Sequence, residues 1–305
     1  MIAKFFNKSS PINTLTIIIL LFVVFILGST TFATAQFSLS FFGKRVIDLG
    51  IVAITFFLVN FIIRKNDLSK ENTYVVILLV CCFGMFPHAT GNREFLLIHL
   101  LLLMAVRRIY SLKSIRKTKE KLFDAGFWIG IVSLINPLGL LFIILIYSGL
   151  ISYKKFTPRN LFIPIVGLIT PLFIYGVYLF SLDRLAEIVP VFTIDFSLTN
   201  YSALHYIIAL TLLIGFLIWT IVPTTIKIMT VKMELKGSWY LLLIHLVTCF
   251  LFILPQPDKN GSELIFLFFP TAVIFTNYLQ QSSENWFKEV FMYLFLAAAF
   301  FVIFL

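Results

Sequence analysis

Three carboxylates, Asp48, Glu94 and Glu263, lie at or just inside the ends of long apolar segments. A carboxylate in such a position is costly unless a cation or water accompanies it, so each of them marks a candidate site. Asp48 and Glu94 are the candidate catalytic residues, because a carboxylate can act as a general base that activates a hydroxyl group. Each also has a structural interpretation. Asp48 follows Arg45 by three residues and can form a local ion pair, and Glu94 can be an acidic residue in the first turn of a helix.

Three basic residues, Arg45, His88 and Arg93, are the candidate substrate-binding residues. His88 lies in a short segment with Thr90, Asn92 and Arg93, and these side chains together can bind an anion such as a phosphate group. An ordinary solvated loop is the alternative interpretation of the same segment.

The histidines and cysteines within apolar segments do not indicate a metal or cofactor site. His99 and His245 are isolated, so each is expected to form a hydrogen bond between helices. Cys81, Cys82 and Cys249 are expected to be buried thiols. The sequence also contains no nucleotide P-loop, dinucleotide fingerprint, zinc motif or hydrolase elbow. No cofactor and no metal are therefore predicted.

The composition identifies the elements that must position these residues. Of the 305 residues 60% are hydrophobic and only 12% are charged, whereas a soluble protein has about 25% charged residues. Apolar segments of about 20 residues recur along the chain, as transmembrane helices require. The predicted fold is an all-α, polytopic transmembrane helix bundle that forms one domain over residues 1–305. The net charge of +10 does not indicate nucleic-acid binding, because the basic residues fall in short loops between apolar segments.

The long apolar segment from Phe123 to Tyr153 is interrupted by the sequence Asn136-Pro137-Leu138-Gly139. A helix of this length measures about 46 Å, against about 30 Å for the membrane core. It is therefore either one tilted, kinked helix or a hairpin. A hairpin places 19 of the 24 lysines and arginines on one side of the membrane, and a single crossing places 14 there. The positive-inside rule favours the hairpin. This topology predicts about eleven membrane helices and a cytoplasmic N-terminus.

Segments outside the apolar helices are expected to contact the membrane surface. Residues 1–13 and 182–200 are predicted to lie along the interface, and the apolar segment that follows residue 13 is interpreted as a membrane helix rather than a cleaved signal peptide. The basic run from Arg107 to Lys121 is predicted to bind anionic lipid headgroups, with RNA, a ribosome or an acidic partner as the alternative. The external face then holds most of the ionisable residues that are of interest for a site: Asp48, His88, Arg93, Glu94, Asp183, Arg184, Glu187, Asp195, His205, Asp258, Lys259 and Glu263.

Three segments of the sequence, residues 5–13, 125–137 and 154–160, resemble an uncharacterised family of polytopic inner-membrane proteins from Bacteroidota. The resemblance covers essentially the whole chain. It implies a multi-pass protein of the bacterial cytoplasmic (inner) membrane and assigns no activity.

In its layout the chain is also similar to the GT-C class of glycosyltransferases, which take sugars from lipid-phosphate donors. This resemblance implies that Asp48 is the base and that Arg45 or Arg93 contacts the phosphate of a polyprenyl-phosphate lipid. The chain departs from that class because its first external loop is very short and lacks paired acids, and because it has no soluble external domain.

Three functions remain open. The first is an accessory or structural subunit of an envelope or export complex with membrane-protein partners, which suits the short loops and the 36 phenylalanines. The second is a GT-C-like enzyme acting on a lipid-linked substrate at the external leaflet. The third is a transporter, which the lack of an internal repeat and of charges within the apolar segments disfavours.

Overall fold

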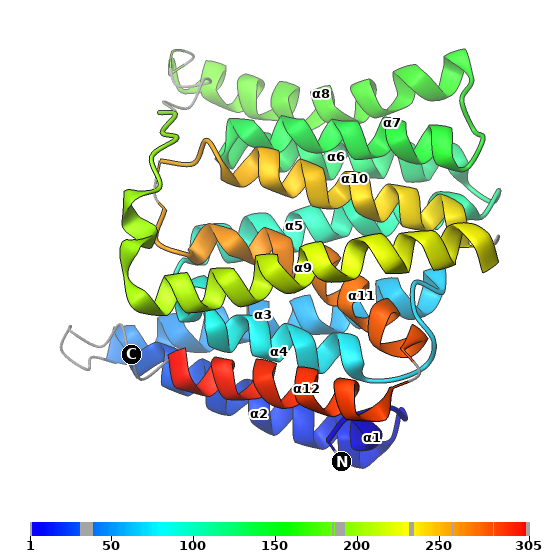
Figure 1. The fold of residues 1–305 in the computed structure, drawn as a ribbon. Coiled ribbons are helices and arrows are strands. Elements are labelled where there is room, and N and C mark those ends of the chain that lie inside the picture. The colour runs from blue at the N-terminus through cyan, green and yellow to red at the C-terminus, as the bar shows by residue number, and fades with distance from the viewer. Residues whose placement is uncertain are drawn as a thin grey trace. The chain divides into compact units, whose positions relative to one another are not determined.

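A computed structural model describes residues 2–30, 39–184, 186, 193–231, 235–257, 259–282 and 284–302. In this part of the chain all regular structure is helical, without strands (Figure 1). Seven described helices are long and apolar enough to cross a membrane, so the chain is an all-α, multi-pass membrane protein, as predicted. The count of eleven helices and the cytoplasmic N-terminus stay predictions. The seven spans are Pro11–Ser29, Phe41–Asn66, Arg93–Lys113, Pro158–Ser181, Leu204–Thr230, Lys236–Ile253 and Ser262–Gln281.

The chain forms two compact units. Unit 1 comprises residues 1–96, 197–233 and 258–305, and unit 2 comprises residues 97–196 and 234–257. A single domain over the whole chain therefore stays a prediction. Within the predicted interfacial segment 182–200, positions 185 and 187–192 lie outside the described residues, as does Asp258.

Helix α11 (Ile265–Gln281) forms the core of unit 1, since 94% of its membrane span is buried. Its aromatic rings interlock with those of neighbouring helices. Phe268 packs edge-to-face on Phe83 of α4 (Tyr74–Met85) with ring centroids 5.1 Å apart. Phe275 packs in the same way on Phe291 of α12 (Asn285–Phe301) at 5.5 Å. Such van der Waals packing is the main force between helices in a membrane.

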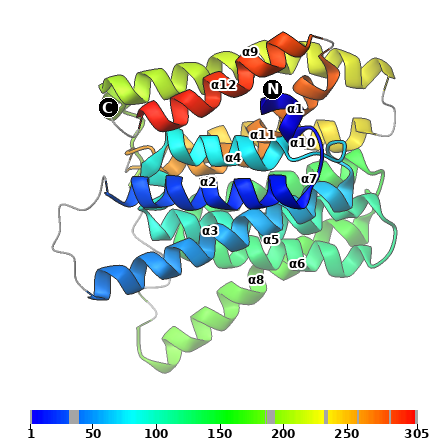
Figure 2. The same cartoon turned by 90° about the horizontal axis from the view of Figure 1, so that it is seen from below.

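The other helices of unit 1 pack around this core, and α2 runs beside α4 (Figures 1 and 2). The short helix at the N-terminus is held by hydrogen bonds, from the Tyr74 hydroxyl to the Ala3 carbonyl oxygen (2.7 Å) and from the Ala3 N–H to Glu289 (3.1 Å). Its predicted position in the membrane interface stays a prediction. The remaining elements of unit 1 are α1 (Ile2–Phe6), α2 (Pro11–Thr30), α3 (Leu39–Asn66), η1 (Pro87–Thr90), the start of α5 (Arg93–Tyr110), η5 (Thr199–Ser202), α9 (Leu204–Val231) and η7 (Ser262–Leu264).

Unit 2 contains the hairpin predicted for residues 123–153. Helix α6 (Thr118–Ile135) ends at the buried residue Asn136, and the chain returns through η3 (Pro137–Phe142) and α7 (Ile143–Ser152). The Asn136 side chain accepts a hydrogen bond from the Leu138 N–H and donates one to Gln256, both at 3.1 Å, so it satisfies the polar groups of the turn. At the other end of the hairpin, the Lys155 ammonium donates to the Ser114 carbonyl oxygen (2.6 Å). The basic segments before and after the hairpin therefore lie together.

Helix α8 (Pro158–Ser181) packs on α6 through glycines. Gly126 and Gly130 of α6 lie against the backbone of α8 at Pro164 and Leu168, and Gly167 of α8 lies against the backbone of α6. A Cβ atom on Gly130 would lie 2.5 Å from the Leu168 carbonyl oxygen. Only residues without a side chain allow two membrane helices to approach this closely. Unit 2 is completed by the rest of α5, η2 (Ser111–Lys113) and α10 (Lys236–Ile253).

The basic run from Arg107 to Lys121 has internal contacts that the sequence did not indicate. Lys121 is buried and donates to the carbonyl oxygens of Ser111 (2.6 Å) and Ser114 (3.1 Å). Arg108 forms an ion pair with Asp124 at 2.7 Å. Binding of lipid headgroups stays a prediction for the exposed basic members of the run, Lys113, Arg116, Lys117 and Lys119.

Candidate functional site

Polar side chains from several helix ends meet at one end of unit 1. The local sequence explains how the chain turns there between α4 and α5. Pro87 begins the short helix η1, where its missing N–H and fixed φ angle are tolerated. The Asn92 side chain then accepts a hydrogen bond from the Phe95 N–H (3.1 Å), which is the arrangement of a helix N-cap. These two residues place Thr90 and Arg93 beside the start of α3.

Arg45, Asp48 and Arg93 form what we call the arginine–aspartate cluster. Asp48 is only 3% exposed. Its Oδ1 atom lies 2.6 Å from Nε of Arg93, and its Oδ2 atom lies 3.5 Å from Nη1 of Arg45. The Arg93 contact is a charge-assisted hydrogen bond, and the Arg45 contact is a longer ion pair. Because Asp48 is buried and ion-paired to two arginines, the geometry gives little support to its predicted role as a base.

Arg45 also connects three separate segments of unit 1. Its Nε donates to Ser29 Oγ of α2 (3.1 Å), and its Nη1 donates to the Thr90 carbonyl oxygen (2.8 Å). The guanidinium carbon lies 4.8 Å from the centre of the Phe25 ring, in a cation–π contact. The side chain is therefore committed to internal partners.

Arg93 is the member of the cluster that remains accessible. Its Nη2 donates to the Lys44 carbonyl oxygen (2.8 Å), and 36% of its side chain is exposed. Two guanidinium groups and one carboxylate leave the cluster with one net positive charge, and the Lys44 side chain beside it is exposed. An anion can therefore approach this end of unit 1 at Arg93.

Glu94 and His88, the other two predicted site residues, differ from Asp48 in their surroundings. Glu94 is exposed, whereas Asp48 is buried, so the two predicted catalytic carboxylates do not share one surface. The His88 ring packs near Tyr206, with centroids 6.1 Å apart. Burial lowers the pKa of His88 below its ordinary value, and the charge of His205 lowers it further.

A second group of polar residues adjoins the first. The sequence singled out its carboxylate, Glu263, by position but assigned no role to it and did not predict its partners. Glu263 of η7 is fully buried, and Tyr201 of η5 donates its hydroxyl hydrogen to the Glu263 carboxylate. The Gly261 N–H donates to the same carboxylate (3.2 Å), from a backbone with a φ of +88° that favours glycine. We call these residues, with Tyr206, whose hydroxyl donates to the Asn260 carbonyl oxygen (2.5 Å), the glutamate–tyrosine cluster.

Asn92 links the two clusters, since its Nδ2 donates to Ser262 Oγ at 3.3 Å. The glutamate–tyrosine cluster supplies neutral donors to Oε1 of Glu263, and the buried Oε2 atom has no hydrogen-bond partner among the described residues. No ion pair involves Glu263 in the part of the chain that the structure describes. The short sequence Asn260-Gly261-Ser262 before a buried acid was the available signal, because it is typical of a tight turn.

Over the same described residues, no three histidine, cysteine, aspartate or glutamate side chains lie close enough to hold a metal ion.

The profile of one protein family matches residues 1–305, over the full length of the sequence given. This is the family DUF6427, described as a family of unknown function. The chain belongs to it. No curated protein and no solved structure matches the chain. Membership of DUF6427 agrees with the predicted resemblance to an uncharacterised family of membrane proteins. An origin in Bacteroidota and the likeness to GT-C enzymes stay predictions.

Proposed function

We propose that the protein is a non-catalytic integral-membrane subunit that packs through α8 against an apolar transmembrane helix of a partner protein. The proposed setting is an envelope or export complex of the bacterial inner membrane. The observation that carries the proposal is the contrast between the two faces of α8.

The inner face of α8 is narrow and rigidly held. Its buried residues are Pro164, Gly167, Pro171 and Leu179, and the glycines described above bring its backbone onto α6. The Tyr147 hydroxyl of α7 adds a hydrogen bond to the Leu161 carbonyl oxygen (3.2 Å). The helix is therefore fixed in place by a small part of its surface.

The outer face of α8 is broad and apolar. Only 17% of the membrane span of α8 is buried. Phe162, Val166, Ile169, Phe173, Val177 and Phe180 recur at helical spacing along this face, and each is at least half exposed. Because the backbone of α8 is already held in place, its large exposed side chains can make van der Waals contacts with a neighbouring helix without the entropic cost of ordering the backbone. This arrangement suits a lateral contact between membrane proteins.

The polar end of unit 1 supports the same proposal. In the arginine–aspartate cluster, Asp48 and Arg45 connect α2, α3, η1 and α5, and neither presents an uncommitted group to a substrate. Charged residues that serve internal contacts suit a structural subunit better than an enzyme.

A GT-C-like enzyme is the second candidate, and the net positive charge of the arginine–aspartate cluster favours it. In that function Arg93 would contact the phosphate of a polyprenyl-phosphate donor, and Glu94 would have to supply the base. Glu94 is exposed whereas Asp48 is buried, so a substrate would not reach the two carboxylates equally, which weakens this candidate. A transporter has no comparable support from the described residues.

Site-specific photo-crosslinking in native membranes tests the proposal. A photoreactive amino acid is placed at Phe173, on the outer face of α8, and at Ile18 of α2, which is 58% exposed, as the matched control. We expect Phe173 to yield a crosslinked polypeptide of defined mass, and Ile18 to yield lipid adducts. The proposal is overturned if both positions react with lipid alone. Loss of a glycosyltransfer product on mutation of Glu94 would favour the enzyme instead.

A further inference from the structure

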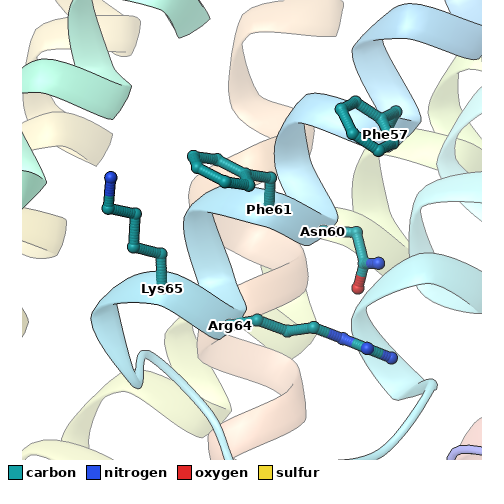
Figure 3. A pocket seen from close by; sticks show the side chains of 5 residues that line it. All are labelled: Phe57, Asn60, Phe61, Arg64 and Lys65. Atoms are coloured by element: carbon teal, nitrogen blue, oxygen red, sulfur yellow. The ribbon is translucent and has the colours of Figure 1, made fainter.

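A shallow groove runs along one face of α3 at the opposite end of unit 1 from the two polar clusters. Phe57, Asn60, Phe61, Arg64 and Lys65 line it, and its volume is about 410 Å³. Figure 3 shows Phe61 and Lys65 on one side of the groove and Asn60 and Arg64 on the other. These residues contribute nothing to the contacts of either polar cluster.

The groove changes from apolar to cationic along the helix. Its lining residues recur at intervals of three and four, so they form one helical face. Phe57, which is 72% exposed, occupies the apolar end, and Arg64 and Lys65 lie in the last turn of α3. The distance along the axis from Phe57 to Lys65 is about 12 Å. One leaflet of the membrane core is about 15 Å thick, so the groove covers much of the length of an acyl chain in that leaflet.

Among the described residues no acid neutralises the two cations of the groove, and their charged groups point to opposite sides of it (Figure 3). The Lys65 ammonium lies 5.2 Å from the centre of the Phe61 ring, so its side chain folds back along the apolar surface. Arg64 donates from Nη2 to Ser9 Oγ (3.0 Å), in the segment between α1 and α2. Among the described ion pairs none joins Arg64 or Lys65 to a carboxylate. The groove therefore keeps two positive charges at its polar end.

We propose that this groove binds an anionic membrane phospholipid. The anionic headgroup lies at the end of the groove that Arg64 and Lys65 make positive, and an acyl chain lies along Phe57 and Phe61. The Asn60 amide, half-buried between the two parts, faces the glycerol ester region of the lipid.

Charge complementarity and the order of the lining residues select this ligand. A soluble phosphate or nucleotide would use the cations and leave the two phenylalanines without a role. An apolar helix of a protein would cover the phenylalanines and meet two unpaired cations in the last turn. A phospholipid with net negative charge matches both parts of the groove at once, and basic residues at the membrane surface attract such lipids.

A photoreactive phosphatidylglycerol with a diazirine in one acyl chain tests the proposal on the purified full-length protein. After irradiation and proteolysis, mass spectrometry locates the modified residues. We expect the adduct within residues 57–65, and we expect unlabelled phosphatidylglycerol to displace the probe while phosphatidylcholine does not.

Two double variants with equal changes of charge complete the experiment. Arg64→Gln with Lys65→Gln should weaken labelling of this segment about thirtyfold, because each basic residue near a lipid surface contributes about a factor of five to binding. Lys4→Gln with Lys70→Gln, which removes two exposed cations outside the groove, should leave labelling within about twofold. All four positions are exposed, and unchanged thermal unfolding of both variants verifies that they fold.

A third variant, Phe57→Ala with Phe61→Ala, keeps the charges and removes the apolar part of the groove, and it should also weaken labelling. The proposal is overturned if phosphatidylcholine competes equally, if both double charge variants lose labelling alike, or if the adduct maps elsewhere.

Discussion

Asp48 is held by two arginines that reach it from different parts of unit 1. Arg45 lies one turn away on the same helix, whereas Arg93 begins a helix 45 residues later. The carboxylate neutralises one of the two positive charges, and its own burial is tolerated because both of its oxygens are paired. The three side chains therefore act as one structural connection between α2, α3, η1 and α5.

Removal of the Asp48 charge should destabilise the fold. We expect Asp48→Asn to lower the free energy of unfolding by about 3 kcal/mol, because it leaves two guanidinium groups close together without a counter-charge. Glu94→Gln, at an exposed position, should change it by less than about 0.5 kcal/mol. Unfolding of both variants in mixed detergent micelles measures the difference. Equal effects of the two substitutions would contradict the structural role of Asp48.

Glu263 should tolerate the loss of its charge better than Asp48, since neutral groups hold it. In Glu263→Gln the amide oxygen can still accept the hydrogen bonds of Tyr201 and the Gly261 N–H, so we expect a cost below about 1 kcal/mol. Tyr201→Phe removes the donor from a buried carboxyl group and should cost about 1–3 kcal/mol. The same unfolding assay compares them. A larger cost for Glu263→Gln than for Tyr201→Phe would show that an ionised carboxylate is required.

His88 should make the stability depend on pH. Because its pKa in the folded protein is lowered by burial and by His205, the folded state keeps the imidazole neutral at pH values where the unfolded chain is protonated. The contribution of neutral His88 to stability is fully present above pH 6.5, the ordinary pKa of histidine. It is lost as the pH falls below 6.5 toward the lowered pKa of the folded state. The unfolding temperature of His88→Gln should therefore fall less steeply between pH 6.5 and 5 than that of the natural protein. Parallel curves would show that His88 does not carry this dependence.

The contact between α6 and α8 depends on the absence of side chains. At Gly126 a Cβ atom would collide with the backbone of α8 at Pro164, and neither backbone can move without separating the helices. We expect Gly126→Ala to destabilise the protein by about 2 kcal/mol or more. Gly50→Ala is the matched control, because a Cβ atom there has no neighbour within 4 Å and alanine favours a helix. The expectation fails if the two variants unfold at the same temperature.

The hairpin and the local ion pair show what the sequence alone can predict in this chain. The distribution of basic residues indicated that residues 123–153 turn back, and the contact between Lys155 and Ser114 agrees. The spacing of Arg45 and Asp48 likewise indicated their pairing. The contacts of Arg93 with Asp48 and of Tyr201 with Glu263 were not predictable, because they join helix ends that are 45 and 62 residues apart. Periodicity and charge describe single helices and loops, whereas such contacts depend on how several helices pack.

The two units each combine a packed interior with a polar or basic end. In unit 1, α11 fills the core, the two polar clusters occupy one end, and the α3 groove lies at the other. In unit 2, the glycines of α6 hold α8, and the broad apolar face of α8 remains uncovered. A multi-pass protein built in this way has Arg45 and Asp48 committed to internal contacts and a broad accessible apolar surface on a firmly held helix. That combination is the physical basis for the proposed role as a subunit.

The most direct measurement is mild purification from native membranes, followed by mass spectrometry of what remains bound. We expect a polypeptide partner in stoichiometric amount with the natural protein and with Gly50→Ala. The combined variant Phe162→Ala with Phe173→Ala should lose that partner while it keeps its own thermal stability, since both side chains are exposed. A protein that purifies without a partner, or a partner that is retained in full by the combined variant, would contradict the account.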